Sequence, residues 1–341
     1  MIAQNFLPAW LYSDQQIFKF ELNKYSKNYW HPLMFVQEIK AGEIIEKKFL
    51  NQSLFISCSS DKLIRVFKNR CPHRGSELLL PKSKGNPSSS IFCPYHGWTF
   101  DDFGRLKTLP LKDDFEPKIE LSDFCLEKVK SLVNGPLIWI NFGDKPLPIN
   151  DQIRLILEKC EYEWNTSYRI FTESIKVFNC NWKIAHDNTL DDYHVAIAHK
   201  NTLHKEQGPI KNYQYFFSKF CNLLTTPMKK NRNLYTFGLL PWTHIIVWPK
   251  RGLVLISYLP ISIDKCNLEI RLASESLSEN ALETWKRSIL KFLEEDKVIV
   301  ESVQKSYEED FKMGPPNRLE QRIIHWQEIY RDYLNASEIY F

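Results

Sequence analysis

The 341-residue sequence has only 11 glycines, and no two of them are separated by a single residue. It therefore lacks the Gly-x-Gly turn of dinucleotide-binding domains, so a built-in nicotinamide or flavin domain of that type is not expected. No uncharged apolar run approaches the roughly 18 residues that a membrane-spanning helix needs. The first 13 residues carry no basic residue ahead of their short apolar stretch, and they do not resemble a secretion signal.

A strong charge of one sign is also missing, since 45 basic residues are nearly balanced by 41 acidic ones, for a net charge of +4. An excess this small does not favour a nucleic-acid-binding protein. The eight cysteines are scattered along a chain that is long enough to fold without disulfides. We therefore expect a cytoplasmic protein with free thiols, no nucleic-acid partner and no membrane span.

The pattern of apolar residues changes near residues 146–150, which indicates two domains. Residues 33–148 contain short strand-like runs separated by turns, for example 53–57 and 63–68, and they predict an all-β domain. Residues 149–341 predict a mixed sheet-and-helix domain, on which residues 1–32 are expected to pack. Its helices are expected at 151–160, at 181–200, from a capping box of Ser276 and Glu279 onwards, and at 318–334, and its strands at 235–248, 252–259 and 267–273. The predicted fold class is α+β.

Two short motifs in the first domain combine cysteine with histidine. They read Cys-Pro-His-Arg-Gly at 71–75 and Cys-Pro-Tyr-His-Gly-Trp at 93–98. Thiolates and imidazoles at these spacings can hold zinc or an iron–sulfur cluster. Zinc more often uses Cys-x2-Cys or His-x3–5-His pairs, whereas a [2Fe–2S] centre with two thiolates and two imidazoles needs one of each from both loops. The candidate ligands are therefore Cys71, His73, Cys93 and His96, and a zinc knuckle is the alternative.

A second constellation lies in the second domain, where His194 and His199 follow Asp191. Three residues apart on a helix, Asp191 and His194 share a face, whereas Asp192 points to the other side. His199 lies about 140° further round an ideal helix, so both histidines meet one metal only if the helix ends or bulges between them. One further carboxylate would complete a two-histidine-one-carboxylate triad, which leaves positions open on Fe(II) for dioxygen and substrate.

Asp296 is the candidate for that carboxylate. It interrupts an apolar stripe that includes Ile289, Leu293 and Val300, on what we expect to be the core-facing side of a long helix. A buried acid is costly unless it is paired or binds a cation. Pairing with a buried basic residue is the alternative, but the upstream histidine pair favours metal ligation. The neighbouring Glu294 and Glu295 are expected to turn towards solvent.

Together these motifs resemble the Rieske non-haem iron oxygenases over about residues 7–334. The two Cys–His loops are similar to the Rieske domain, and Asn181-Trp182-Lys183, Asp187-Asn188 and His-x4-His are similar to the helix-grip-like catalytic domain. Segment 295–304 resembles the helix that carries the carboxylate ligand. The segments 180–183, 193–195 and 198–200 look most like oxygenases of quaternary ammonium compounds, although Thr189 stands where these usually have an aromatic residue.

The resemblance implies an oxygenase subunit that hydroxylates or N-demethylates a small organic molecule with dioxygen as co-substrate. It implies a [2Fe–2S] cluster on the four Rieske ligands and Fe(II) on His194, His199 and Asp296. Asn188 would lie beside the ligands, and Asp191 would bridge the iron site to a Rieske histidine of a neighbouring subunit in a homotrimer. Two alternatives stay open: an aromatic-ring dioxygenase of the same family, and a Rieske electron-transfer protein with a ligand-binding domain.

Electrons must come from another protein, because a [2Fe–2S] cluster stores one electron and the chain has no dinucleotide motif. We expect a separate NAD(P)H-dependent reductase, with or without a ferredoxin. The stretch 207–263 contains no acidic residue and seven basic ones. It is either a solvated loop around 228–233 or a patch for an acidic donor or an anionic substrate. The aromatic residues of the same stretch could surround a methylammonium group or belong to a sheet core.

Overall fold

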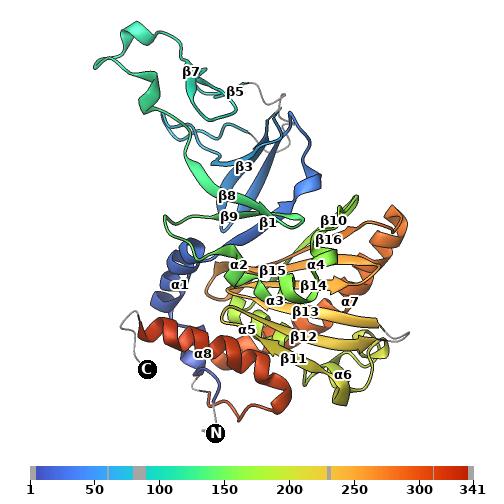
Figure 1. Ribbon diagram of the computed structural model, residues 1–341. Helices are drawn as coiled ribbons and strands as arrows, with labels where there is room; N and C mark the ends of the chain where they lie inside the picture. Colours follow the sequence, from blue (N-terminus) through green and yellow to red (C-terminus); the bar gives the residue numbers. More distant parts are fainter. Residues whose placement is uncertain (1–4, 60, 80–89, 229–231, 310, 337–341) are drawn as a thin grey trace. The chain divides into compact units, whose positions relative to one another are not determined.

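The computed structural model describes residues 5–59, 61–79, 90–228, 232–309 and 311–336 (Figure 1). The chain divides into two compact units. One comprises residues 31–144, and the other combines residues 1–30 with residues 145–341. The sheets and helices confirm the predicted α+β class. Within the described ranges, no helix combines the length and the apolar character that crossing a bilayer requires.

The unit of residues 31–144 is built from two antiparallel sheets. The larger has the strand order β1-β9-β8-β4-β3-β2, and the smaller has the order β5-β6-β7. The predicted strands at 53–57 and 63–68 are confirmed as β3 and β4. The strands are β1 (His31–Phe35), β2 (Ile44–Phe49), β3 (Gln52–Cys58), β4 (Ile64–Lys68), β5 (Ile91–Phe92), β6 (Thr99–Phe100), β7 (Leu106–Thr108), β8 (Lys128–Asn134) and β9 (Leu137–Asn141).

The unit of residues 1–30 and 145–341 is built on a seven-stranded antiparallel sheet with the order β10-β16-β15-β14-β13-β12-β11. Its strands are β10 (Ile170–Phe178), β11 (Gln214–Phe217), β12 (Cys221–Met228), β13 (Arg232–Leu239), β14 (Thr243–Trp248), β15 (Gly252–Ser262) and β16 (Lys265–Ser274). Its helices are α1 (Gln15–Asn28), α2 (Ile149–Gln152), α3 (Arg154–Lys159), α4 (Glu161–Trp164), α5 (Trp182–Leu190), α6 (Val195–Ala198), α7 (Glu279–Tyr307) and α8 (Gln321–Asn335).

Several predicted elements of this unit need correction. The expected strand at 235–248 is two strands, β13 and β14, and β10, β11 and β12 were not expected. Helix α7 is capped by Ser278, whose Oγ accepts from the N–H of Ala281 at 3.3 Å, and not by a box at Ser276. The expected helix at 181–200 is broken, because α5 ends at Leu190 and the single turn α6 begins at Val195.

Helix α7 packs against α5 and against β10 and β16, which are neighbouring strands at one edge of the sheet (Figure 1). Its buried positions recur every three or four residues, as the sequence predicts for a helix with one apolar face. They are Leu282, Trp285, Ile289, Leu293, Asp296, Val300 and Gln304. The polar member Gln304 is explained by the N–H of Asn181, which donates to its Oε1 at 2.7 Å. Asp296 needs a separate explanation.

A buried ion pair connects α1 to α5. The Nζ of Lys183 lies 2.6 Å from Oε1 of Glu21, and the two side chains are 0% and 1% exposed. Trp182 donates its indole N–H to Oε2 of Glu21 at 3.0 Å, and the hydroxyl of Tyr330 donates to Oε1. Burial lowers the pKa of the Lys183 ammonium, and Glu21 offsets part of that shift. Helix α1 is thereby anchored beside α5.

Replacing Lys183 by methionine should destabilise the unit that contains α1 and α5 by about 3–5 kcal/mol, because Glu21 would stay buried without its counter-ion. The double change Glu21→Leu with Lys183→Met should recover most of that loss. The matched control is Lys176→Met, which removes an exposed pair with Glu294 and should cost no more than about 1 kcal/mol. Urea unfolding followed by tryptophan fluorescence measures all three. Equal losses for Lys183→Met and Lys176→Met would contradict this account.

Candidate metal centres

Two loops of the first unit have matching backbone geometry around Cys71 and Cys93. In each loop the cysteine N–H donates to the carbonyl five residues later at 2.8 Å, and the cysteine carbonyl accepts from the glycine four residues later, at 2.9 and 3.0 Å. Gly75 and Gly97 have φ angles of +78° and +74°, which side chains other than glycine rarely adopt. The glycines therefore allow both loops to turn back on their cysteines.

The four predicted cluster ligands lie together at the tips of these loops. The thiols of Cys71 and Cys93 are buried, and neither forms a disulfide. Burial, together with the neighbouring Cys93 thiol, raises the pKa of Cys71 to about 11. The ring centroids of His73 and His96 are 4.6 Å apart, and the buried Nδ1 of His73 has no hydrogen-bond partner within the described ranges. Two thiols and two imidazoles from paired loops fit a [2Fe–2S] cluster with two ligands of each kind.

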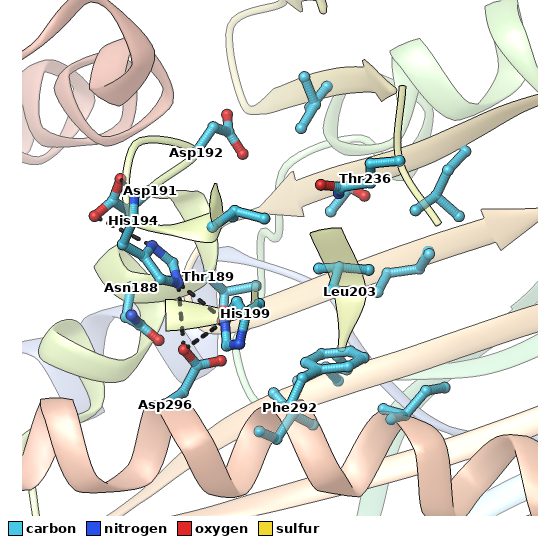
Figure 2. A pocket seen from close by; sticks show the side chains of 18 of the residues that line it. Asn188, Thr189, Asp191, Asp192, His194, His199, Leu203, Thr236, Phe292 and Asp296 are labelled. Atoms are coloured by element: carbon cyan, nitrogen blue, oxygen red, sulfur yellow. Dashed lines mark hydrogen bonds and ion pairs between the residues drawn. The ribbon is translucent and has the colours of Figure 1, made fainter. Parts of the chain in front are cut away.

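The second constellation converges on one point in the other unit. His194 precedes the single turn α6, His199 follows it, and Asp296 projects from α7. The Nε2 atoms of the two histidines are 3.1 Å apart. Oδ1 of Asp296 lies 3.3 Å from Nε2 of His194 and 3.0 Å from Nε2 of His199. Figure 2 shows the two rings and the carboxylate pointing toward one another. On one continuous helix the two histidines would point about 140° apart. Because the helix is broken after α5, both rings can face the same point.

These distances suit a metal ion. Three ligands on one face of an octahedron, each roughly 2.1 Å from the metal, lie about 3.0 Å from one another. The Asp296 side chain is only 6% exposed, and its Oδ1 accepts no well-aligned hydrogen bond from the residues that the structure describes. A carboxylate oxygen that binds a metal ion needs no hydrogen-bond donor, so this arrangement is the one expected if Oδ1 of Asp296 is a metal ligand. The donor set of two imidazoles and one carboxylate fits Fe(II) with positions left open.

The electrostatics also favour a cation at this point. Burial opposes the charged form of His194, but Asp191 and Asp296 outweigh it and raise its pKa to about 10. Burial likewise opposes ionisation of Asp296, but its interactions with His194 and His199 keep its pKa below the usual value. The surrounding acids therefore attract positive charge, which either protons or a metal can supply.

Asp191 and Asn188 line a cavity that His194, His199 and Asp296 also line. Oδ1 of Asp191 accepts from the N–H groups of Tyr193 and His194 at 2.7 and 3.3 Å, and its Oδ2 lies 3.3 Å from Nδ1 of His194. The sequence predicted that Asp191 and His194 share one face of a helix. They do lie together, but they meet across the turn between α5 and α6. Oδ1 of Asn188 is buried without a hydrogen-bond partner in the described part of the chain.

Glycine at position 238 of β13 positions this turn. A Cβ atom there would lie 2.6 Å from Cδ2 of Leu190 and 2.7 Å from Oδ1 of Asn222, which is closer than real contacts allow. Leu190 is the last residue of α5 and is fully buried. The bare backbone of Gly238 therefore lets the end of α5 approach the sheet, immediately before Asp191.

Glu295 was expected to point to solvent, and that prediction is wrong. Its Oε2 accepts from Nδ1 of His199 at 2.8 Å and from Oγ1 of Thr202 at 2.7 Å. Burial opposes ionisation of Glu295, but these two hydrogen bonds lower its pKa. The segment after α6 crosses α7 and leaves the Glu295 side chain 31% exposed, and no local sequence pattern indicates that contact. Glu294 is exposed and pairs with Lys176, as expected for a surface position.

Asp192 is turned away from His194, His199 and Asp296, as Figure 2 shows, and it forms a buried ion pair. Arg322 of α8 donates from Nη2 to Oδ1 at 2.7 Å and from Nε to Oδ2 at 3.0 Å. The side chains are 3% and 1% exposed. Arg322 also donates to the carbonyl of Thr189 at 3.2 Å. Sequence reasoning missed Arg322, whose partner lies 130 residues away.

A cavity of about 70 Å³ adjoins His194, His199 and Asp296, and its walls are largely apolar. They include Leu203, Leu224, Leu234, Ile246, Val254 and Ile256. Of the aromatic residues singled out between 213 and 248, Trp248 lines this cavity, and α7 adds Phe292. In the basic stretch, Lys229 and Lys230 lie outside the described residues, and the side chain of Arg232 is not described either.

Comparison with known families and proteins agrees with both centres. Residues 29–130 match the Rieske [2Fe–2S] domain, and residues 157–336 match the ring-hydroxylating alpha subunit catalytic domain. The carnitine monooxygenase oxygenase subunit of Escherichia coli (strain K12) is 27% identical over 326 residues, covering 88% of this chain and 83% of its own. The glycine betaine monooxygenase oxygenase subunit of Chromohalobacter salexigens is 28% identical over 199 residues, covering 58% of this chain and 44% of its own.

Solved structures share the fold. A quaternary ammonium Rieske monooxygenase in complex with L-carnitine superimposes with a TM-score of 0.84 at 22% identity, covering 97% of this chain and 96% of the other. Naphthalene 1,2-dioxygenase with bound indole gives a TM-score of 0.77 at 16% identity, covering 89% and 81%. The catalytic-domain match alone spans more than half of the sequence. The chain therefore belongs to the Rieske non-haem iron oxygenases, oxidoreductases that use a [2Fe–2S] cluster and a mononuclear iron to oxidise substrates with dioxygen.

Proposed function

We propose that this chain is a cytoplasmic oxygenase subunit that hydroxylates or N-demethylates a small organic molecule in the cavity beside Asp296. The observation that carries the proposal is the convergence, within 3.3 Å, of three donor atoms from α7 and from both ends of α6. The cluster ligands are Cys71, His73, Cys93 and His96. The iron ligands are His194, His199 and Asp296.

When bound, the iron supplies dioxygen chemistry and the cluster supplies electrons one at a time. The residues of the chain prepare the site for this chemistry. Glu295 holds a proton at Nδ1 of His199, which leaves the Nε2 lone pair of that ring facing Asp296. The aliphatic wall excludes water and holds an apolar part of the substrate on the side that the three ligands leave open.

N-methylated substrates are favoured by the relatives, whose names specify carnitine and glycine betaine. Trp248 and Phe292 are aromatic residues in the wall that could contact a methylammonium group. Ring dioxygenation is less favoured, because naphthalene dioxygenase is similar to this chain in fold alone. Electrons would come from a separate NAD(P)H-dependent reductase, with or without a ferredoxin, since the sequence has no Gly-x-Gly motif.

Metal analysis tests the two centres separately. The wild-type chain should contain about three irons, two in the cluster and one at the mononuclear site. Asp296→Ala should contain about two and keep the spin-resonance signal of the reduced cluster. Cys93→Ser should lose that signal and keep about one iron.

The matched control is Glu294→Ala, which changes an exposed neighbour of Asp296 and should keep all three irons. A wild-type protein with only two irons would identify an electron carrier rather than an oxygenase. A colourless protein that contains zinc would contradict both centres.

Asp191 is proposed to bridge the iron site to a Rieske histidine of a neighbouring subunit in a homotrimer. It contacts His194 while remaining 20% exposed, and His96 is exposed in its own unit. Asp191→Asn should leave iron content and reduction of the cluster by its donor unchanged. Reoxidation of the reduced cluster by dioxygen in a single turnover should slow at least about tenfold, or about 1.4 kcal/mol of barrier. Unchanged reoxidation in stopped-flow absorbance would remove this role.

Glu295→Gln should weaken iron binding about 10–100-fold, because the amide loses the negative charge that orients His199. Competition with a ferrous chelator measures the change, and the cluster absorbance provides an internal reference. Glu294→Gln is the control on the adjacent, exposed position. If both variants release iron at the wild-type chelator concentration, Glu295 has no part in metal binding.

A further inference from the structure

A second cavity of about 690 Å³ adjoins the one beside the iron ligands. Leu203, Trp248, Ile289 and Phe292 line both cavities, so these residues separate an inner from an outer compartment. The outer cavity lies between the segment after α6, the turn from β14 to β15 and the first half of α7. It is large enough for a substrate group that extends away from the iron.

The outer cavity is cationic. Lys205, Arg251 and Lys291 line it, against one acid, Glu206. None of these three cations forms an ion pair with a carboxylate in the part of the chain that the structure describes. The Arg251 guanidinium lies over the rings of Trp248 and Trp285, 4.6 and 5.5 Å from their centroids. Stacking of this kind holds the guanidinium in place while its N–H groups stay free to bind a carboxylate.

The position of Arg251 in the wall is fixed by a buried ring. Trp285 lines the same cavity, is 4% exposed and lies under the guanidinium, so its ring is a rigid support for the cation. The first turn of α7, which carries the positive end of a 29-residue helix, contributes Asn280 and Ala281 to the wall.

The inner cavity has the opposite character. Its arginine, Arg322, forms a buried ion pair with Asp192, and its walls are mainly apolar. A molecule that spans both compartments would therefore place an apolar or methylated end near the iron ligands and a charged end near Arg251. Trp248 stands at the boundary and would contact both ends.

We propose that the outer cavity binds the carboxylate of the substrate through Arg251 and Lys291. This carboxylate fixes how far the opposite end reaches towards His194, His199 and Asp296. The inference rests on the proposed function for the identity of the inner cavity as the place of oxidation. It adds that the substrate is an organic anion or a zwitterion and not a neutral hydrocarbon.

Acid and methyl-ester pairs test the proposal by titration calorimetry, without dioxygen or electron donor. The probes are hexanoate, 3-phenylpropanoate and 4-(trimethylammonio)butanoate, each with its methyl ester. At least one acid should bind about tenfold more tightly than its ester, which corresponds to about 1.4 kcal/mol. Added salt should weaken binding of the acid more than that of the ester.

Variants locate the binding group. Arg251→Gln and Lys291→Gln should each weaken binding of the preferred acid about tenfold and leave binding of its ester within about twofold. Arg287→Gln is the matched control, because this exposed residue of α7 lines neither cavity. Lys291 is also exposed, so its replacement should not disturb folding.

Equal affinity for every acid and ester, failure of every acid to bind, or acid binding that survives Arg251→Gln and Lys291→Gln would overturn the proposal. Such results leave the oxygenase assignment standing if about three irons per chain are present. Loss of the mononuclear iron in the wild-type protein would instead contradict the proposed function, whatever the probes bind.

Discussion

Asp296 is an acid on the buried face of α7, with Leu293 and Val300 one turn away on either side. Removing a carboxylate from water costs several kcal/mol unless a positive charge compensates it. Among the described residues its ion-pair partners are His194 and His199, and no lysine or arginine reaches it. The fold therefore concentrates negative charge at a point that only protons or a metal ion can neutralise. The break between α5 and α6 serves to bring both rings to this carboxylate.

The features that the sequence predicted are those that local chemistry determines. A seam of period three to four is visible in the sequence, so the interruption at Asp296 could be found without a structure. The paired Cys–His loops could also be found, because each motif is a short continuous run of residues. Glu295 was misjudged, because its contacts with His199 and Thr202 depend on how the segment after α6 crosses α7. The position of Asp192 opposite Arg322 likewise depends on tertiary packing and leaves no periodic trace.

One helix face couples the parts of the candidate site. Trp285, Ile289, Phe292 and Asp296 follow one another along α7 at spacings of three or four residues, so they share a side of the helix. The face passes from the outer cavity through the shared wall to the metal ligand. A rigid helix of this kind would keep constant the distance between an anionic group in the outer cavity and a metal ion held by Asp296. The substrate carbon that is oxidised would then be selected by length as well as by chemical reactivity.

The central claim is that two iron centres occupy this chain and that an acid on α7 holds the second. Anomalous diffraction from crystals of the purified protein, collected on both sides of the iron absorption edge, tests it most directly. The account predicts a pair of iron atoms between the thiols of Cys71 and Cys93 and the rings of His73 and His96. It also predicts a single iron atom bonded to His194, His199 and Asp296. Absence of iron at this second position, with the Asp296 carboxylate directed elsewhere, would contradict it.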